Sequence, residues 1–335
     1  MTITKVACLI SIGNNMRSYA SDVEATEGLK NLYKLLKDEV AKVIVGQDEV
    51  IDKVLISILS KGHALLIGVP GLAKTLMITT IAKSLGLSFS RIQFTPDLMP
   101  SDIIGTEILG EDRQFRYIKG PIFSHIVLAD EVNRTPPKTQ SALLEAMQER
   151  EVSVAGVSHK LPDPFFVLAT QNPIEQEGTY PLPEAQLDRF MFSIWLDYPS
   201  MDEEIEVVKR TTLESMPEAS VVTTKEELIY FQNLVRRVPV NDNVLRYAVS
   251  LTAKTRPGTN SATADSYIAW GAGPRSSQYL ILGAKCHALL HGKYSPDIED
   301  VQAVAENVLQ HRIVKNYKAE AEGLSSREII RKLQA

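Results

Sequence analysis

An apolar strand, a glycine-containing loop and a helix follow one another in His63-Ala-Leu-Leu-Ile-Gly-Val-Pro-Gly-Leu-Ala-Lys-Thr75, an order that few folds accommodate. Gly68 and Gly71 allow the loop to turn with its backbone N–H groups facing inward around an anion. Lys74 can then reach the β- and γ-phosphates of a nucleotide, and the Thr75 hydroxyl can ligate Mg²⁺. Ala73 occupies the position of the last glycine in the general pattern G-x-x-x-x-G-K-S/T. The segment alone predicts a phosphate-binding loop with one departure from the usual pattern.

The overall composition excludes several classes of protein. The chain has 335 residues, of which 44% are hydrophobic, enough for a sizeable core and typical of two domains. Its net charge of −5 gives no overall positive field for nucleic acid or an anionic membrane. Cys8 and Cys286 form no disulfide framework, which fits a reducing cytosol. Residues 6–12 faintly resemble a signal peptide but lack a cleavage site, and no run approaches the ~20 apolar residues of a membrane span. We therefore expect a cytoplasmic protein without a transmembrane segment.

Strand-like and helical segments alternate in the first part of the chain. Helical patterns at 24–42 and 43–59 precede the loop, and a third helix follows it at 75–85. The later segments are strand-like at 88–94, 125–129, 165–170 and 190–196, and helical at 137–149 and 183–189. This alternation predicts a mainly parallel sheet covered on both faces, with its ligand outside the carboxyl ends of the strands.

The remaining segments suggest a second domain and two insertions. After residue 200 the pattern is helical, with segments at 202–212, 225–235, 244–255, 276–291 and 298–310. Hairpin patterns at 106–118 and 151–161 are not needed to complete the sheet, and they are either decorative or arms that contact a partner. We expect a flexible N-terminal extension over 1–22, a nucleotide-binding core over 23–199 and a helical domain over 200–335.

Polar side chains follow two of the predicted strands. The strand from His125 ends in the paired carboxylates Asp130 and Glu131, which an all-apolar buried strand does not require. In a phosphate site Asp130 would hold Mg²⁺ and Glu131 would polarise the attacking water. Asn172 follows the next strand and could hold that water or contact the γ-phosphate, although an Asn before a proline is more often a turn former.

Two arginines are candidates for stabilising charge on the γ-phosphate. Arg189 ends a short helix just before a strand, and Arg275 begins a helix in the second domain. Each could equally be a surface arginine or half of a salt bridge. The six histidines form no metal-ligand set, and Cys286 lies in an apolar helical stretch typical of a core residue.

Several longer strings occur together with these motifs: Gly68-Val-Pro-Gly-Leu-Ala-Lys-Thr75, Gln93-Phe-Thr-Pro-Asp97, Leu128-Ala-Asp-Glu131, and residues 136–149 and 169–190. On these strings the chain resembles the MoxR family of AAA+ ATPases, in the helix-2-insert clade, over roughly residues 36–313. An alanine before the lysine is the form that this family uses, so Ala73 fits the resemblance.

The resemblance implies an AAA+ core with a parallel five-stranded sheet in the order 5-1-4-3-2 and an all-α C-terminal lid. The hairpins would be the helix-2 insert and the pre-sensor-1 hairpin. Lys74 and Thr75 would be the Walker A residues, Asp130 and Glu131 the Walker B pair, and Asn172 sensor 1. Arg189 would be the arginine finger given to a neighbouring subunit, and Arg275 would be sensor 2. The residues implied to bind nucleotide are Gln47, Gly68, Pro70, Gly71, Leu72, Ala73, Lys74, Thr75 and Leu76.

The resemblance also implies a function: Mg²⁺-dependent ATP hydrolysis that drives chaperone-like remodelling or maturation of a protein partner. The resemblance implies a hexameric ring as the assembly and a von Willebrand factor A domain protein as a partner. Within the same fold, the alternatives are the motor subunit of a metal chelatase and a helix-2-insert helicase. The hairpin over 152–161 contains only His159 and Lys160 as basic candidates, so nucleic acid is not the expected partner. A nucleotide-gated scaffold that hardly hydrolyses ATP is a third hypothesis, against which the intact Glu131 argues.

Overall fold

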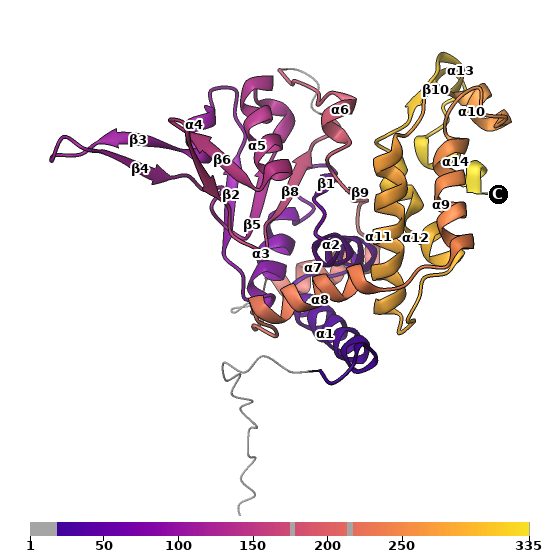
Figure 1. Ribbon diagram of the computed structural model, residues 1–335, viewed down its shortest axis with the longest axis horizontal. Helices are drawn as coiled ribbons and strands as arrows, with labels where there is room; N and C mark the ends of the chain where they lie inside the picture. The colour runs from indigo at the N-terminus through magenta and orange to yellow at the C-terminus, as the bar shows by residue number, and fades with distance from the viewer. Residues whose placement is uncertain (1–18, 175–177, 213–216, 335) are drawn as a thin grey trace, which may run out of the picture.

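A five-stranded sheet forms the centre of the computed structural model, which describes residues 19–174, 178–212 and 217–334. Its strands are all parallel and lie in the order β2 (Phe89–Gln93), β5 (Ile126–Asp130), β8 (Phe166–Gln171), β1 (Ala64–Ile67) and β9 (Phe192–Trp195) (Figure 1). Counted along the chain among these five, the order is 2-3-4-1-5. From the other edge it is 5-1-4-3-2, which confirms the order that the family resemblance implies.

Helices cover both faces of this sheet because successive side chains of each strand point to opposite faces. Leu66 of β1 and Leu168 of β8 pack in one apolar cluster with α1 (Asp22–Val43), α2 (Asp48–Leu59) and α3 (Lys74–Ser84). Leu65 and Val167, one residue earlier in each strand, pack in a second cluster with α4 (Pro100–Ile104) and α5 (Pro137–Glu149). The strands are therefore apolar on both sides, as a buried parallel sheet requires.

The C-terminal part of the chain is mainly helical and packs beside β9 (Figure 1). Its elements are α7 (Met201–Thr211), α8 (Lys225–Arg237), α9 (Asp242–Lys254), α10 (Ala262–Tyr267), α11 (Pro274–Leu290), α12 (Ile298–Leu309), α13 (Tyr317–Ala321) and α14 (Ser326–Gln334). A short antiparallel pair, β10 (Ile268–Trp270) and β11 (Val314–Lys315), adds a small sheet to the helical lid.

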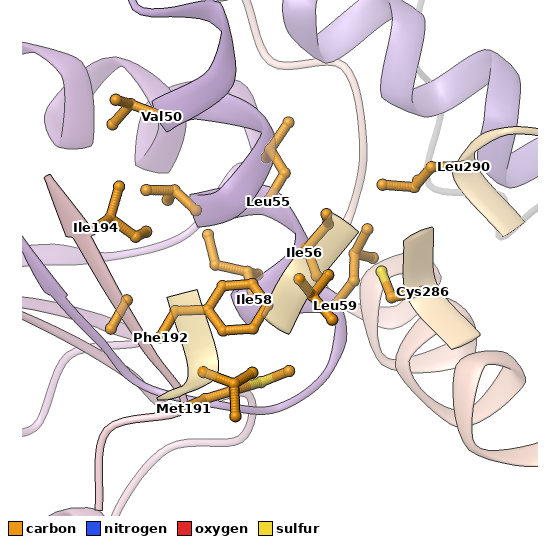
Figure 2. Packing of buried hydrophobic residues seen from close by; sticks show 14 of the residues in the cluster. Val50, Leu55, Ile56, Ile58, Leu59, Met191, Phe192, Ile194, Cys286 and Leu290 are labelled. Atoms are coloured by element: carbon orange, nitrogen blue, oxygen red, sulfur yellow. The ribbon is translucent and has the colours of Figure 1, made fainter. Parts of the chain in front are cut away.

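One apolar cluster joins the lid to the core. Figure 2 shows Cys286 and Leu290 of α11 beside Leu59 of α2, with Phe192 of β9 nearby. Cys286 is fully buried and unpaired, and burial raises the pKa of its thiol to about 12, so it is a core residue as expected. Because the cluster is continuous, the packing itself does not divide the chain at residue 200, and that boundary stays a prediction.

The N-terminal prediction falls mostly outside the described residues, since the structure is described from Tyr19 onward and Cys8 is not included. The last part of the expected extension is packed: the Tyr19 ring stacks on Tyr230 with 5.4 Å between centroids, and α1 already begins at Asp22. None of the helices in the described ranges combines the length and apolar character that crossing a bilayer requires.

Both expected hairpins are present. The first consists of β3 (Gly105–Leu109) and β4 (Phe115–Lys119) and projects away from the rest of the molecule (Figure 1). The second consists of β6 (Glu151–Val154) and β7 (Val157–Lys160) and follows α5 directly. The two are joined by a ring contact, because Tyr117 of β4 stacks on His159 of β7 with 4.2 Å between centroids.

Candidate functional site

The loop between β1 and α3 has the backbone shape of an anion-binding turn. Gly71 has φ +87°, and a Cβ placed there would meet nothing within 4 Å, so the space above the loop is open. Ala73 has φ 53° and precedes the first residue of α3. A left-handed backbone costs an alanine about 1 kcal/mol. This conformation turns the following N–H groups toward the space in front of the N-terminus of α3, where an anion would bind. The alanine therefore adopts the conformation that a glycine would have in this place.

Lys74 is held inside this loop. Its Nζ donates to the carbonyl oxygens of Gly68 at 2.5 Å and of Val69 at 3.1 Å. Partial burial lowers the pKa of the Lys74 ammonium, while the charges of Asp130 and Glu131 act in the opposite direction. Phosphate oxygens could take the place of the two carbonyls as acceptors for this ammonium. Thr75 is the second residue of α3 and is half-buried.

Asp130 ends β5 within a hydrogen-bonded cluster that the sequence did not reveal. Arg91 of β2 donates to Asp130 Oδ2 from Nε at 3.0 Å and from Nη2 at 2.6 Å. The Thr170 hydroxyl of β8 donates to Asp130 Oδ1 at 2.6 Å and accepts the Glu131 N–H at 2.8 Å. Two neighbouring strands thus fix the carboxylate and the start of the following turn.

Glu131 leaves the strand with a left-handed backbone, at φ 57° and ψ 49°. Its Oε2 accepts a hydrogen bond from Gln93 Nε2 at 2.7 Å and another from Arg134 Nη1 at 2.9 Å. Asn172 is buried directly after β8, the strand between β1 and β5, and its Oδ1 accepts the Ile174 N–H at 3.2 Å. The carboxyl edge of the sheet therefore brings Lys74, Thr75, Asp130, Glu131 and Asn172 together, as expected.

This edge fits Mg²⁺ bound together with a nucleotide. The ion prefers hard oxygen ligands and usually takes one or two carboxylates plus substrate phosphates rather than a cage made by protein alone. The oxygens of Asp130 and Thr75 are ligands of this kind. Among the residues described here, no group of three or more His, Cys, Asp or Glu side chains forms a protein-only metal site.

A cavity of about 350 Å³ adjoins the phosphate loop and fits the nucleoside half of a nucleotide. Gln47, at φ 61°, lies at its edge and donates from Nε2 to Asp197 O at 3.0 Å. Six residues implied to bind nucleotide line it: Gln47, Pro70, Gly71, Leu72, Ala73 and Leu76. Ten further residues, which the sequence motifs did not assign to the nucleotide, also line it: Val43, Ile44, Val45, Met77, Tyr198, Pro199, Glu204, Val207, Arg210 and Thr211.

The two candidate arginines lie at the opposite edge of the sheet. Arg189 and Arg275 line a small pocket of about 190 Å³ together with Lys61, Arg150 and Tyr279, among others. Arg189 lies just before β9. Two residues later, the backbone N–H of Met191 donates to the carbonyl oxygen of His63 at 2.7 Å, and His63 directly precedes β1. The phosphate loop follows the opposite end of β1. Four strand residues span roughly 13 Å, which separates the loop from the end of β1 beside Arg189. Neither arginine therefore joins the phosphate loop of its own chain.

Arg275 is fixed at this amino edge by a carboxylate. Its Nη1 donates to Asp188 Oδ2 at 2.9 Å, and both side chains are partly exposed. The surrounding charge is mainly positive, because Lys61 and Arg150 line the same pocket. A pocket of this composition is suited to an anion that approaches from outside the chain.

Comparison with known proteins gives two family matches. Residues 63–192 match the family described as "ATPase family associated with various cellular activities (AAA)", and residues 260–333 match the "AAA lid domain". The first range contains four strands of the sheet and ends at the first residue of β9, and the second contains the C-terminal part of the lid.

Individual relatives are similar over most of the chain. Chaperone MoxR1 of Mycobacterium tuberculosis is 45% identical over 298 residues, which cover 88% of this chain and 79% of the relative. Protein MoxR of Methylorubrum extorquens is 31% identical over 295 residues, or 82% of this chain and 85% of the relative. A crystal structure from Cytophaga hutchinsonii superposes with a TM-score of 0.87 at 45% identity, covering 92% of this chain and 95% of that one.

Proposed function

The chain belongs to the MoxR family of AAA+ ATPases, and we propose that it hydrolyses ATP with Mg²⁺ in order to remodel a protein partner. The observation that carries this proposal is the distribution of charged groups over the two edges of the sheet. The phosphate loop and the paired carboxylates lie at the carboxyl edge, and Arg189 and Arg275 lie at the amino edge. Phosphoryl transfer requires both sets of groups: those that bind phosphate and metal at the carboxyl edge, and the arginines at the amino edge.

The carboxyl edge would bind the nucleotide and activate water. The N–H groups of the loop and Lys74 would hold the phosphates, with Thr75 and Asp130 as the ligands of the ion. Bound Mg²⁺ would neutralise charge on the β- and γ-phosphate oxygens. Glu131 would accept the proton of the attacking water, and Asn172 would orient that water.

The amino edge would act on the nucleotide of a second copy. Arg189 and Arg275 lie too far from their own phosphate loop, and their pocket opens at the protein surface. A guanidinium supplied in trans to the γ-phosphate is worth roughly 10³–10⁵ in rate in enzymes where it has been measured. Hydrolysis would then need an assembly in which the amino edge of one subunit meets the carboxyl edge of the next. A hexameric ring, the assembly implied by the family, satisfies this requirement.

The projecting hairpin supports a protein client rather than nucleic acid. Leu109 and Phe115 form a cross-strand pair at its tip and are 60% and 71% exposed. Residues 105–119 carry three acidic and three basic side chains, so the hairpin has no net charge to attract phosphates. An exposed apolar pair suits contact with apolar segments of another protein. On the resemblance to the family, we include a von Willebrand factor A domain protein among the proposed partners.

Substitution of Glu131 tests the catalytic assignment. Glu131→Gln should bind ATP as the parent does and lose steady-state hydrolysis, because the amide cannot accept the proton of the attacking water. Glu145→Gln, on the exposed face of α5, is the matched control and should hydrolyse ATP normally. Unchanged turnover in Glu131→Gln would contradict the proposal.

Mixed assemblies test whether the arginines act in trans. Arg189→Ala should be inactive alone but regain turnover when mixed with Glu131→Gln, whose amino edge is intact. Arg246→Ala, which removes an exposed arginine paired with Asp242 on α9, is the control and should need no partner. A lack of restored turnover in the mixture would show that Arg189 has only a structural role.

The same trap can identify the client. Glu131→Gln loaded with ATP should retain a client that the parent releases after hydrolysis, and the captured protein can be identified by mass spectrometry. Capture that is equal with ATP and with ADP would argue for a nucleotide-binding scaffold instead.

A further inference from the structure

The loop that carries Arg189 is held by one buried side chain of the lid. Arg312, three residues beyond the end of α12 and 7% exposed, donates from Nη2 to the carbonyl oxygens of Asp188, at 3.0 Å, and of Phe190. It donates from Nη1 to Met191 O at 3.2 Å. A single guanidinium therefore holds the backbone on both sides of Arg189.

The same guanidinium also controls the second arginine of the pocket. Arg312 Nε donates to Asp188 Oδ1 at 2.7 Å, and the other oxygen of that carboxylate accepts from Arg275 at 2.9 Å. Tyr279 of α11 completes the arrangement, since its hydroxyl lies 3.5 Å from Arg189 O and its ring lies 5.1 Å from the Arg312 guanidinium. Arg189 and Arg275 are thus fixed by one network that comes from the lid.

The geometry of this network depends on a guanidinium rather than on positive charge alone. The planar fork presents donors in several fixed directions, and here it serves one carboxylate and four backbone carbonyls at once, one of them Val308 O of α12. An ammonium at this position would keep the charge but could not make the same set of hydrogen bonds. Burial of a charged group is unfavourable unless it is paired. Apart from Val308 O of α12, the hydrogen-bond partners of Arg312 are Asp188, Phe190 and Met191, which flank Arg189 at the amino edge.

We propose that Arg312 is a positioning residue that presents Arg189 and Arg275 to the nucleotide of the adjacent subunit. The inference rests on the proposed function, in which these two arginines act in trans. Because Arg312 belongs to the lid, the position of the lid in one subunit then determines whether that subunit can support hydrolysis in the next. The role of Arg312 is distinct from nucleotide binding in its own subunit.

The test is an assay of Arg312→Lys alone and in mixtures. Turnover alone should fall at least about tenfold, toward the level of Arg189→Ala, since misplaced guanidinium groups lose part of their effect on the γ-phosphate. Affinity for ATP should stay within about twofold of the parent, because the carboxyl edge is untouched. Mixing with Glu131→Gln should restore turnover, since the intact arginines of that subunit complete the site of the Arg312→Lys subunit.

A matched variant separates positioning from a general loss of stability. Asp300 is a buried lid carboxylate that pairs with His287 at 2.7 Å and with Lys293 at 3.0 Å, away from the Arg189 loop. Asp300→Asn should lower the melting temperature and leave turnover of the folded protein unchanged. If Arg312→Lys does not fold, Asp188→Asn serves the same test, because it keeps the side-chain shape and weakens both ion pairs.

The outcomes distinguish this inference from the proposed function. Parental turnover in Arg312→Lys overturns the inference, and so does a loss that Glu131→Gln fails to rescue while it rescues Arg189→Ala. If Arg189→Ala is itself fully active or cannot be rescued, the proposed function fails and the inference falls with it. Rescue of both variants with unchanged ATP affinity supports the positioning role.

Discussion

Gln93 Nε2 donates to Glu131 Oε2 at 2.7 Å, so the side chain at the end of β2 holds the proposed catalytic base at the end of β5. The register of the sheet makes this possible, because Gln93 lies opposite Asp130 in the parallel ladder. In this arrangement the Glu131 carboxylate is occupied by protein donors, which restrict its access to an attacking water.

Removal of this hydrogen bond should therefore raise basal ATP turnover. We expect Gln93→Ala to increase the steady-state rate roughly 2- to 10-fold, the range that corresponds to a single hydrogen bond of ~0.5–1.5 kcal/mol. ATP affinity should not change, because Gln93 does not line the nucleotide cavity. A reduced rate would indicate that Gln93 helps to place Glu131 for catalysis.

Thr170 should be important for stability as well as for the site. Thr170→Val removes the hydroxyl that pairs with Asp130 Oδ1 and with the Glu131 N–H, and it leaves that buried carboxylate oxygen and the partly buried N–H without this partner. We expect a loss of about 1–3 kcal/mol in the free energy of unfolding, measured by urea denaturation. Thr170→Ser keeps the hydroxyl and should recover most of the loss; equal losses in both variants would assign the effect to packing.

His63 makes the fold sensitive to acid. Its Nδ1 accepts the Val167 N–H at 2.9 Å, so the neutral ring donates from Nε2 to Met147 O, which lies 3.1 Å away. Burial lowers the pKa of His63 to about 4 from an ordinary 6.5, so the unfolded chain binds the proton more tightly. Stability should be intact above pH 6.5 and fall by about 3 kcal/mol as the pH drops toward 4.

The pH dependence can be assigned to His63 by substitution. His63→Gln cannot titrate, so the slope of unfolding free energy against pH between 6.5 and 4 should become shallower in this variant. An unchanged slope would place the acid sensitivity in other groups.

The apolar hairpin tip should decide client binding. Replacement of Leu109 and Phe115 by serine removes the exposed cross-strand pair and should reduce client capture by the Glu131→Gln trap at least about tenfold, as loss of two apolar anchors would. Gln114→Ser, between the strands of the same hairpin, is the matched control. Full capture by the double variant would show that the client binds elsewhere on the protein.

The sequence predicted the features that repeat along the chain. Lys74, Asp130 and Asn172 each follow an apolar strand in the sequence. Because the carboxyl ends of parallel strands lie at the same edge of a sheet, this pattern predicted that the three residues lie at one edge. The helical lid is also confirmed, both hairpins are present where the pattern indicated them, and the order of the strands is the one that the family resemblance implied. The roles assigned to the individual site residues stay predictions until the variants are measured.

Contacts that depend on register were beyond the sequence. Arg91 and Gln93 reach Asp130 and Glu131 only because β2 pairs with β5 in one particular alignment, which no local pattern encodes. Tyr198 lines the nucleotide cavity from the connection before α7, far from any motif. The strands β10 and β11 have three and two residues, too short for a periodic signal.

The separation of Lys74 and Arg189 to opposite edges of the sheet has a consequence for partial assemblies. If the arginines act in trans as proposed, an open row of subunits would have a nucleotide at one end that receives no arginines. At the other end it would have an arginine pair with no nucleotide to act on. Closure of the row into a ring would join these two ends and add one working site without adding a subunit. Specific activity should therefore rise with protein concentration and level off once most subunits are in closed assemblies.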